Sequence, residues 1–306
     1  MGLVLVGTCG WTDPTLLGSG WYPIDARTAE ARLQHYAAHF SLAEVDSTYY
    51  ALPSPRNAGL WAERTPADFT FDVKVFRLFT QHPTPRPSFP KDVQKELAAT
   101  RPGASNLYFA NLPQELRTEM LRRFLDALLP LESAGKLGVV LFQFPPWFLP
   151  TDESREFILG MKESMGLFRM AVEFRSGSWF NDRSLERTIS FLEGNHLPLV
   201  SVDGPQGFQS SVPPLPLVTA DSGLVRFHGR NAETWEKKGI TATERFRYLY
   251  SQEELQEWVP KLKEMASKTK QLHVLMNNCY ADYAVMNGQQ VSLLLGEEQS
   301  GTIGEA

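Results

Sequence analysis

The amino-acid sequence predicts a parallel α/β fold whose strands close into a (β/α)8 barrel, the TIM barrel. The chain has 306 residues, a length at which α/β barrels often fold as one domain. Eight apolar runs of strand-like composition alternate with segments of helical periodicity, which indicates parallel strands joined through helices. An open nucleotide-binding sheet is disfavoured, because no Gly-x-Gly-x-x-Gly follows the first strand and no Gly-Lys-Ser/Thr motif occurs.

The expected strands are runs rich in Val, Leu and Phe that end near polar residues, Gly or Pro. They are expected at Val4–Cys9, Leu42–Thr48, Phe69–Phe76, Leu137–Phe144, Phe168–Phe174, Leu197–Asp203, Leu224–Gly229 and Gln271–Asn277. Amphipathic helices, recognised by apolar residues three and four positions apart, are expected at Thr28–His39, Pro55–Glu63, Pro113–Leu131, Glu153–Glu163, Arg183–Glu193, Gln252–Thr269 and Ala281–Leu295.

Two connections are longer than the others and are rich in proline. Segment 77–112 follows the third strand, and segment 204–222 follows the sixth. Long connections are usually functional or mobile, and the loops after barrel strands build active sites. Residues 1–296 are expected to form one barrel domain with these two long loops, and residues 297–306 a flexible tail.

The composition is that of a globular protein with a large core and a mildly acidic charge. Hydrophobic residues make up 42% of the chain and charged residues 21%, which excludes general disorder. The net charge of −5 excludes a generally basic nucleic-acid binder and leaves a local basic patch open. No apolar run reaches the roughly 20 residues needed to span a bilayer. With two cysteines and no basic segment of a signal peptide at the N-terminus, a cytoplasmic location and no membrane partner are expected.

Strand alternation predicts a charged barrel interior. Successive side chains of a barrel strand point alternately into the interior and out toward the helices. Val225 and Phe227 are apolar and should face the helices, so Arg226 and His228 should face the interior. The same rule turns inward Glu44, Asp46, Asp72, Lys74, Gln143, Glu173, Arg175, Asp203 and Asn277.

Charged groups in a barrel interior need an explanation, because burying an unpaired ion costs several kcal/mol. One explanation is a salt-bridge network that fills the barrel. The preferred one is a functional pocket, because most of these residues lie at the carboxyl ends of the strands, where TIM-barrel enzymes act.

The candidate catalytic residues are those expected to move protons. Burial is expected to raise the pKa of Glu173, which would suit a general acid or base. Lys74 or His228 would be the second proton-transfer group, and Asp203 completes the set. An internal ion pair is the alternative role for Glu173 and for Lys74.

The candidate substrate-binding residues combine cations, amides and aromatic rings. Arg226 and Arg230 flank Gly229, and arginine forks suit carboxylate or phosphate oxygens. Aromatic side chains after the strands either stack on sugars or bases or pack the loops. The full predicted set is Arg175, Arg226, Arg230, Asp46, Gln143, Asn277, Asn278, Trp11 and Tyr49.

No cofactor is expected to be required, and a divalent metal is the alternative. The cations of the same interior would compete for its carboxylates, and neither His-Glu-x-x-His nor Cys-x-x-Cys occurs. The oxygen-rich set that would hold such a metal comprises Glu44, Asp46, Glu173, Asp203 and His228.

An ordered series of short motifs spans nearly the whole chain: Gly7–Trp11, Trp21–Pro23, Glu44–Tyr50, Gln143–Pro146, Glu173–Arg175, Arg226–Arg230 and Asn277–Asn278. This series resembles the YecE-like proteins, a family defined by domain of unknown function 72. The resemblance implies a TIM barrel and the position of the site, and it implies no reaction. Two residues depart from the family pattern. Asp46 stands where an asparagine is expected, and Met276 stands where an aromatic residue is usual before Asn277 and Asn278.

Three functions remain open from the sequence. The first is an enzyme that acts by acid/base chemistry on a small anionic or polyhydroxylated, sugar-like substrate at the barrel mouth. The second is a metal-dependent barrel of the isomerase or nuclease kind. The third is a non-catalytic protein that binds nucleic acid or a metabolite, although the acidic net charge disfavours nucleic acid.

Overall fold

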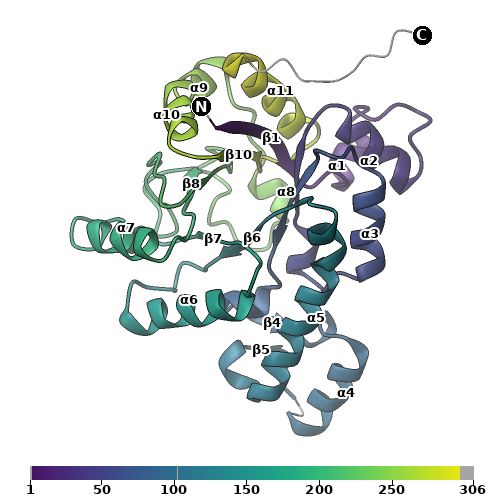
Figure 1. Ribbon diagram of the computed structural model, residues 1–306, viewed down its shortest axis with the longest axis vertical. Helices are drawn as coiled ribbons and strands as arrows, with labels where there is room; N and C mark the ends of the chain where they lie inside the picture. The colour runs from purple at the N-terminus through teal and green to yellow at the C-terminus, as the bar shows by residue number, and fades with distance from the viewer. Residues whose placement is uncertain (1, 102, 297–306) are drawn as a thin grey trace.

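The computed structural model describes residues 2–101 and 103–296, and within them eight parallel strands form a nearly closed barrel (Figure 1). The hydrogen-bonded order is β7-β6-β3-β2-β1-β10-β9-β8. The strands are β1 (Leu3–Cys9), β2 (Leu42–Val45), β3 (Thr70–Lys74), β6 (Leu137–Gln143), β7 (Met170–Glu173), β8 (Val200–Asp203), β9 (Ser222–Phe227) and β10 (Gln271–Met276). The predicted fold class and all eight predicted strands are confirmed.

The barrel closes weakly between β7 and β8, the two strands at the ends of the sheet order. A single parallel bridge joins Val172 of β7 to Leu199 just before β8, and the amide of Val172 donates to the carbonyl of Pro198 at 2.8 Å. The other neighbouring strands pair over three to six residues. The β7–β8 seam is therefore the weakest join of the barrel wall.

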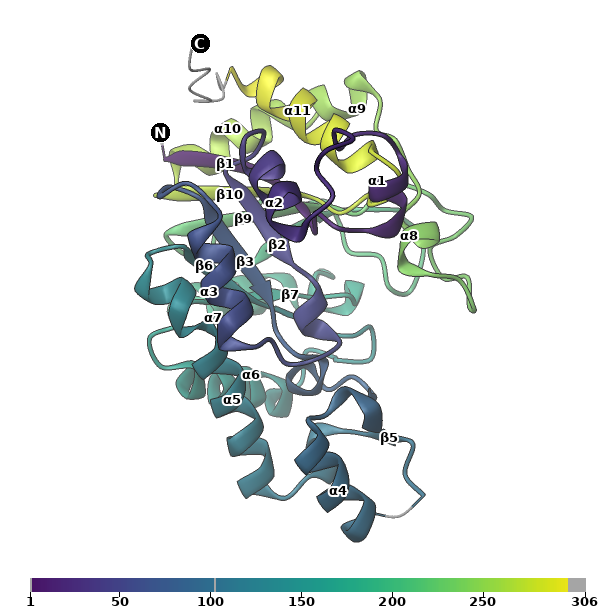
Figure 2. The same ribbon diagram turned by 90° about the vertical axis from the view of Figure 1, so that its right-hand side faces the viewer.

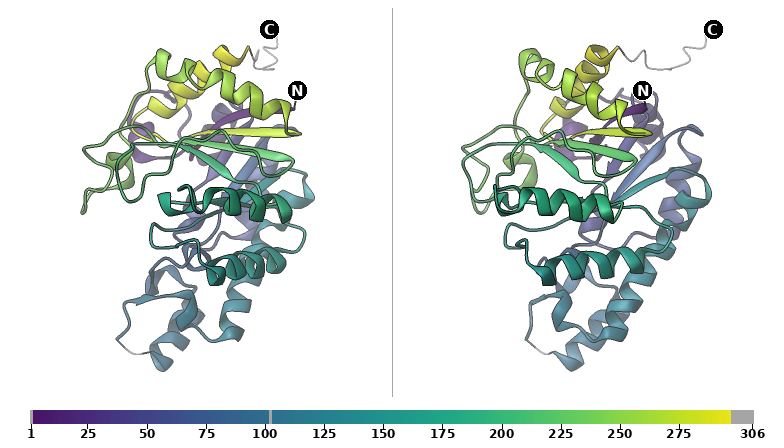
Figure 3. Two further views of the ribbon diagram at one scale, coloured as in Figure 1. Left: turned by 90° about the vertical axis from the view of Figure 1, so that its left-hand side faces the viewer. Right: turned by 60° about the vertical axis from the view of Figure 1, so that its left-hand side comes forward.

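Helices cover the outside of the barrel, and Figures 1 and 3 show α6 and α7 side by side on its outer face. Thr28, Ser54 and Thr151 begin α2, α3 and α6 by accepting hydrogen bonds from backbone amides three residues on. No helix of residues 2–101 and 103–296 is long and apolar enough to cross a membrane. The helices are α1 (Pro14–Gly18), α2 (Ala29–Ala37), α3 (Pro55–Glu63), α4 (Lys91–Thr100), α5 (Gln114–Ser133), α6 (Asp152–Met165), α7 (Leu185–Gly194), α8 (Ala242–Arg245), α9 (Gln252–Gln256), α10 (Val259–Ser267) and α11 (Tyr283–Leu295).

Two expectations about the segments between strands need correction. The single helix predicted over Gln252–Thr269 is two helices, α9 and α10. Pro260 causes the break, because proline has no N–H to donate and its ring clashes with the carbonyl group four residues earlier. That carbonyl belongs to Gln256, the residue at which α9 ends. The predicted long loop 77–112 is also largely structured: β4 (Thr84–Pro85) and β5 (Asn106–Leu107) pair antiparallel on either side of α4 in the sequence (Figure 1).

The structured segment 77–112 projects from one side of the barrel (Figure 2), and its buried side chains continue the apolar core outside the barrel wall. Phe79, Phe89, Leu97 and Leu107 are buried in it, and the ring of Phe79 lies 6.3 Å from Phe124 of α5. The apolar contact fixes the segment to the outside of the barrel. The second long connection, 204–222, contains no helix, as predicted, and the predicted tail 297–306 lies outside the described residues.

Strand alternation is confirmed on most strands of the barrel. Val225 and Phe227 of β9 pack outward against Trp258 and Leu262. In the interior, small apolar clusters fill the middle of the barrel: Leu5, Leu42 and Leu275 on one side, and Val139, Leu141, Ala171, Val200, Val202 and Leu224 on the other.

Below these clusters, toward the amino ends of the strands, a buried pair crosses the interior. His273 Nδ1 of β10 lies 2.9 Å from Asp72 Oδ2 of β3, and the amide of Val139 donates to Asp72 Oδ1 at 2.9 Å. Gly138 leaves the room for this pair, because a Cβ there would lie 2.3 Å from Asp72 Oδ1 and 3.0 Å from His273 Cε1.

Replacing Gly138 by alanine is expected to destabilise the fold by about 1–3 kcal/mol, because the added methyl overpacks the Asp72–His273 pair. Gly160→Ala is the matched control, since nothing lies within 4 Å of the position on the exposed face of α6. The control should gain about 0.5–1 kcal/mol from helix propensity. Urea unfolding measures both, and equal stabilities of the two variants would contradict the packing described.

Candidate functional site

A buried ion cluster centred on Arg226 occupies the carboxyl end of the barrel interior. Its Nη1 donates to Glu173 Oε2 and its Nη2 to Glu44 Oε1, both at 2.6 Å. Nη2 also lies 3.4 Å from the sulfur of Cys9. The side chains of Arg226, Glu44 and Glu173 have no exposed surface. Arg226 therefore joins β9 to β2 and β7 across the interior.

Glu173 is surrounded by donors, and this reverses the pKa shift expected for it. Its Oε1 accepts from Gln143 Nε2 at 2.6 Å, from Arg175 Nη1 at 3.2 Å and from His228 Nε2 at 3.1 Å. Burial alone would raise the pKa of Glu173, but Arg226 and these donors hold it well below its ordinary value. The expectation of a raised pKa is wrong, and Glu173 is a fixed anion that orients its neighbours.

His228 is held as a neutral ring between two partners. Burial, aided by the charge of Arg175, lowers the pKa of His228 to about 3. A neutral ring has one N–H, and Nε2 uses it toward Glu173, so Nδ1 accepts from Asn277 Nδ2 at 2.6 Å. Because both nitrogens are engaged, His228 is placed to position Glu173.

Glu44 has the opposite environment to Glu173, although both bind Arg226. Within the described part of the chain, Glu44 Oε2 has no hydrogen-bond donor. Burial raises the pKa of Glu44 to about 8; Arg226 opposes this rise and the neighbouring negative charge of Asp46 adds to it. The carboxyl of Glu44 thus holds a proton at neutral pH, the property predicted for Glu173.

Asp46 lies beside Glu44 and nearer to solvent, with 32% of its side chain exposed. Burial alone would raise the pKa of Asp46. Lys74, whose Nζ lies 3.5 Å from Asp46 Oδ1, outweighs burial and lowers this pKa. Burial acts to lower the pKa of Lys74, but Asp46 outweighs it and the pKa is raised. Lys74 therefore stays charged, and it does not have the depressed pKa of a catalytic base.

Cations and aromatic rings surround this carboxyl pair at the mouth. Lys74 Nζ and the Arg77 guanidinium lie 4.8 and 5.1 Å from the centre of the Tyr49 ring. The ring of His82 lies 5.4 Å from the same centre. Arg175 lies on the other side, 4.7 Å from the ring of Trp235. The structure thus brings Tyr49 and Lys74 together as predicted and adds Arg77 and His82, which follow the third strand in the long segment singled out from the sequence.

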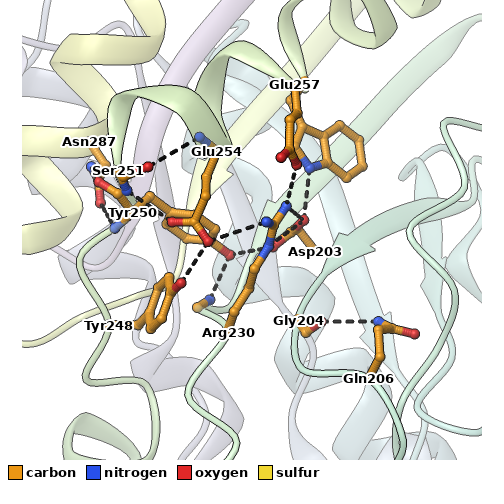
Figure 4. Close-up of polar contacts among 12 residues, drawn as sticks. Asp203, Gly204, Gln206, Arg230, Tyr248, Tyr250, Ser251, Glu254, Glu257 and Asn287 are labelled. Atoms are coloured by element: carbon orange, nitrogen blue, oxygen red, sulfur yellow. Dashed lines mark hydrogen bonds and ion pairs between the residues drawn. The ribbon is translucent and has the colours of Figure 1, made fainter.

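Asp203 is outside the barrel, which corrects its predicted inward orientation. Val200 and Val202 occupy the interior, so Asp203 points between β8 and the outer helices. There it accepts from Tyr250 Oη at 2.7 Å and from Trp258 Nε1 at 2.8 Å. Figure 4 shows Arg230 bound to this carboxylate at 2.8 Å and to Glu254 and Glu257 at 3.2 and 3.3 Å.

Arg230, which was predicted to hold an anion, is therefore engaged by three carboxylates away from the Arg226 cluster. Two further predicted residues also lie apart from it. Trp11, expected at the rim, is buried against Tyr36, Trp61 and Phe71 outside the barrel wall. The amide of Asn278 donates to Tyr248 O and Asn287 Oδ1 and joins the loop after β10 to α11.

The oxygen-rich set proposed for a metal does not form one cluster. Asp203 lies outside the barrel, and Glu44 and Glu173 both bind Arg226. Among residues 2–101 and 103–296, no three His, Cys, Asp or Glu side chains are arranged to hold a metal ion.

The fold and site define an α/β barrel protein of the TIM class with a charged, aromatic mouth at the carboxyl ends of its strands. The chain belongs to the family described as protein of unknown function DUF72, whose model matches residues 5–306. The resemblance to the YecE-like proteins is thereby confirmed.

Curated relatives of the chain carry the name UPF0759. YunF of Bacillus subtilis strain 168 is 33% identical over 303 residues, covering 98% of this chain and 97% of the relative. YecE of Escherichia coli strain K12 is 23% identical over 252 residues, covering 77% of this chain and 78% of the relative. Neither name describes a reaction.

Solved structures of the same family share the fold. A DUF72 family protein of Enterococcus faecalis V583 matches with a TM-score of 0.77 at 25% identity, over 96% of each chain. One of Thermotoga maritima MSB8 matches with a TM-score of 0.75 at 30% identity, over 96% of this chain and all of that one.

Arg226→Met is expected to destabilise the protein by about 3–5 kcal/mol, because it removes the cation bound to the buried anion of Glu173 and the donor to Glu44. Arg122→Met on α5 is the control, since that side chain is 58% exposed and solvent screens its ion pairs. Chemical unfolding at pH 7 measures the difference. An Arg226→Met protein as stable as the control would contradict the central place of this ion cluster.

Proposed function

We propose that this protein is a TIM-barrel enzyme that acts by acid/base chemistry on a small anionic or polyhydroxylated substrate at the barrel mouth. One arrangement carries the proposal: burial raises the pKa of Glu44, whose Oε2 receives no hydrogen bond among the described residues, whereas Lys74, 3.5 Å away, lowers the pKa of the neighbouring Asp46. Two neighbouring carboxyl groups that share one proton are suited to give and to take a proton in turn.

Asp46 is the member of the pair that reaches the substrate. Its side chain is about one-third exposed, whereas that of Glu44 has no exposed surface. As acid, Asp46 relays the proton of Glu44 to the leaving or product atom, which leaves both carboxyl groups ionised. As base, Asp46 then takes a proton from the substrate and passes it back to Glu44, which restores the singly protonated pair. Catalytic contact with the reacting atoms is thus assigned to Asp46.

The remaining residues of the site hold this pair in place and bind the substrate. Glu173 and Arg226 fix the position of Glu44, and His228 and Gln143 fix Glu173. Lys74 keeps Asp46 ionised and lies at the mouth with Arg175. These cations favour substrates with a negative group.

The pH dependence follows from the two opposite shifts. Below pH 8 Glu44 is protonated, and Asp46 stays ionised until the pH falls below its ordinary range. The singly protonated pair is therefore present between these limits. Above pH 8 Glu44 ionises and the pair has no proton to give, so an acid-catalysed step slows with a midpoint near pH 8.

Glu44→Gln is expected to reduce turnover by about a hundredfold or more, because the amide has the shape of the protonated acid and no proton to pass on. A panel of small phosphorylated, carboxylated and polyhydroxylated compounds in D₂O, followed by proton NMR, detects both conversion and exchange of carbon-bound hydrogen. Glu96→Gln on the exposed face of α4 is the control and should match the wild type. Substrate turnover that survives in Glu44→Gln would refute the proposed proton donor.

A further inference from the structure

We propose that the mouth binds a doubly charged phosphate monoester, with its phosphoryl group held by Lys74 and Arg77. The inference rests on the proposed function, because it identifies the anionic group of the substrate that Asp46 and Glu44 act on. Binding of the phosphoryl group is measured without turnover, so its test is independent of the test of the Glu44–Asp46 pair.

The ring of Tyr49 is the point around which the basic side chains gather. Lys74 comes from the end of β3, and Arg77 and His82 come from the segment that follows it. All three lie within 4.8–5.4 Å of the ring centre. In the part of the chain that the structure describes, Arg77 Nε is buried and has no hydrogen-bond partner. Arg77 thus lies against the Tyr49 ring with this donor unused.

The charges of the site leave room for a dianion. Four cations, Lys74, Arg77, Arg175 and Arg226, face the ionised carboxylates of Asp46 and Glu173, with Glu44 protonated. These cations therefore outnumber the ionised carboxylates, and Arg245 adds a further positive charge that acts on Arg175. A phosphate monoester carries close to two negative charges at pH 7, since its second pKa is about 6. Its negative charge suits this excess of cations, and guanidinium forks suit its oxygens.

His82 reports the electrostatic field at this point. Burial lowers its pKa to about 3, and the charges of Lys74, Arg77 and Arg175 all add to the lowering. Two of these cations, Lys74 and Arg77, lie against the neighbouring Tyr49 ring. The ring is held there by a hydrogen bond of 2.8 Å between Nδ1 and Thr80 Oγ1.

An exposed indole lies beside this position and gives the organic part of an ester a surface. Trp147 is 57% exposed, and its ring centre lies 5.8 Å from that of His82. It follows β6 at the carboxyl end of the barrel, on the same side as the cations. A planar or sugar group next to a bound phosphoryl group can stack on it. An ester should therefore bind more tightly than free phosphate.

The test compares two arginines that have similar surroundings. Arg77→Gln removes the cation over Tyr49, and Arg117→Gln removes one over Phe109, at 5.0 Å, on α5. Both have a buried Nε without a partner among the described residues, so neither change strands a carboxylate bound to it. Calorimetric titration at pH 7 and constant ionic strength uses inorganic phosphate and phenyl phosphate as probes, with chloride as the reference salt.

The wild type and Arg117→Gln should bind phenyl phosphate with the same affinity. Arg77→Gln should bind it about tenfold or more weakly, because one charge-assisted hydrogen bond is lost. Trp147→Ala should weaken phenyl phosphate and leave inorganic phosphate unchanged. Absence of phosphate binding by the wild type, or equal affinities of Arg77→Gln and Arg117→Gln, would overturn the phosphoryl site. Either result leaves the Glu44–Asp46 pair standing, whereas phosphate binding with full turnover in Glu44→Gln overturns only the proton pair.

Discussion

The paired hydrogen bonds of Arg226 to Glu44 and Glu173 are the interaction on which the rest of the site depends. Three buried ionisable groups from β2, β7 and β9 meet there, and none has contact with solvent. Because leaving a buried ion unpaired costs several kcal/mol, this arrangement holds all three strands in one relative position. The same arrangement sets how many hydrogen-bond donors surround Glu44 and Glu173. The number of donors decides whether each carboxyl group is charged or protonated.

Glu44 and Glu173 illustrate how one side-chain type acquires two roles. Glu173 receives hydrogen bonds from Arg226, Arg175, Gln143 and His228, so its charged form is favoured. Glu44 receives one from Arg226 and faces the like charge of Asp46, so its neutral form is favoured. Environment thus separates a fixed anion from a proton carrier. Asp46, nearer to solvent, connects the proton carrier to the cationic mouth.

Much of this arrangement could be predicted from the period of two along each strand. The rule placed Arg226, His228 and Glu173 in the interior because their neighbours are unambiguously apolar. It failed at Asp203, because Leu199 and Val200 are both apolar and either could begin the inward face. The partners that stabilise Asp203 outside the barrel, Tyr250 and Trp258, come from a distant segment that alternation cannot place.

The sequence could not show that Glu44, and not Glu173, has the raised pKa, for a related reason. Alternation placed Glu44 in the interior with Glu173, but the hydrogen bonds that distinguish them come from β6, β7 and β9. Trp11 shows the same limit: its position after β1 indicated the rim, whereas contacts with Tyr36 and Trp61 bury it outside the wall. Long-range contacts, and not local pattern, decide these positions.

The account depends most directly on the proton of Glu44, and carbon-13 NMR of protein labelled at glutamate side-chain carboxyls observes it. The Glu44 signal is assigned by its absence from the Glu44→Gln spectrum. The account predicts that this carboxyl is protonated at pH 7 and titrates with a midpoint near pH 8. A midpoint near 4.5, the value of an ordinary glutamate, would contradict it, since both carboxyls of the pair would then be ionised at neutral pH.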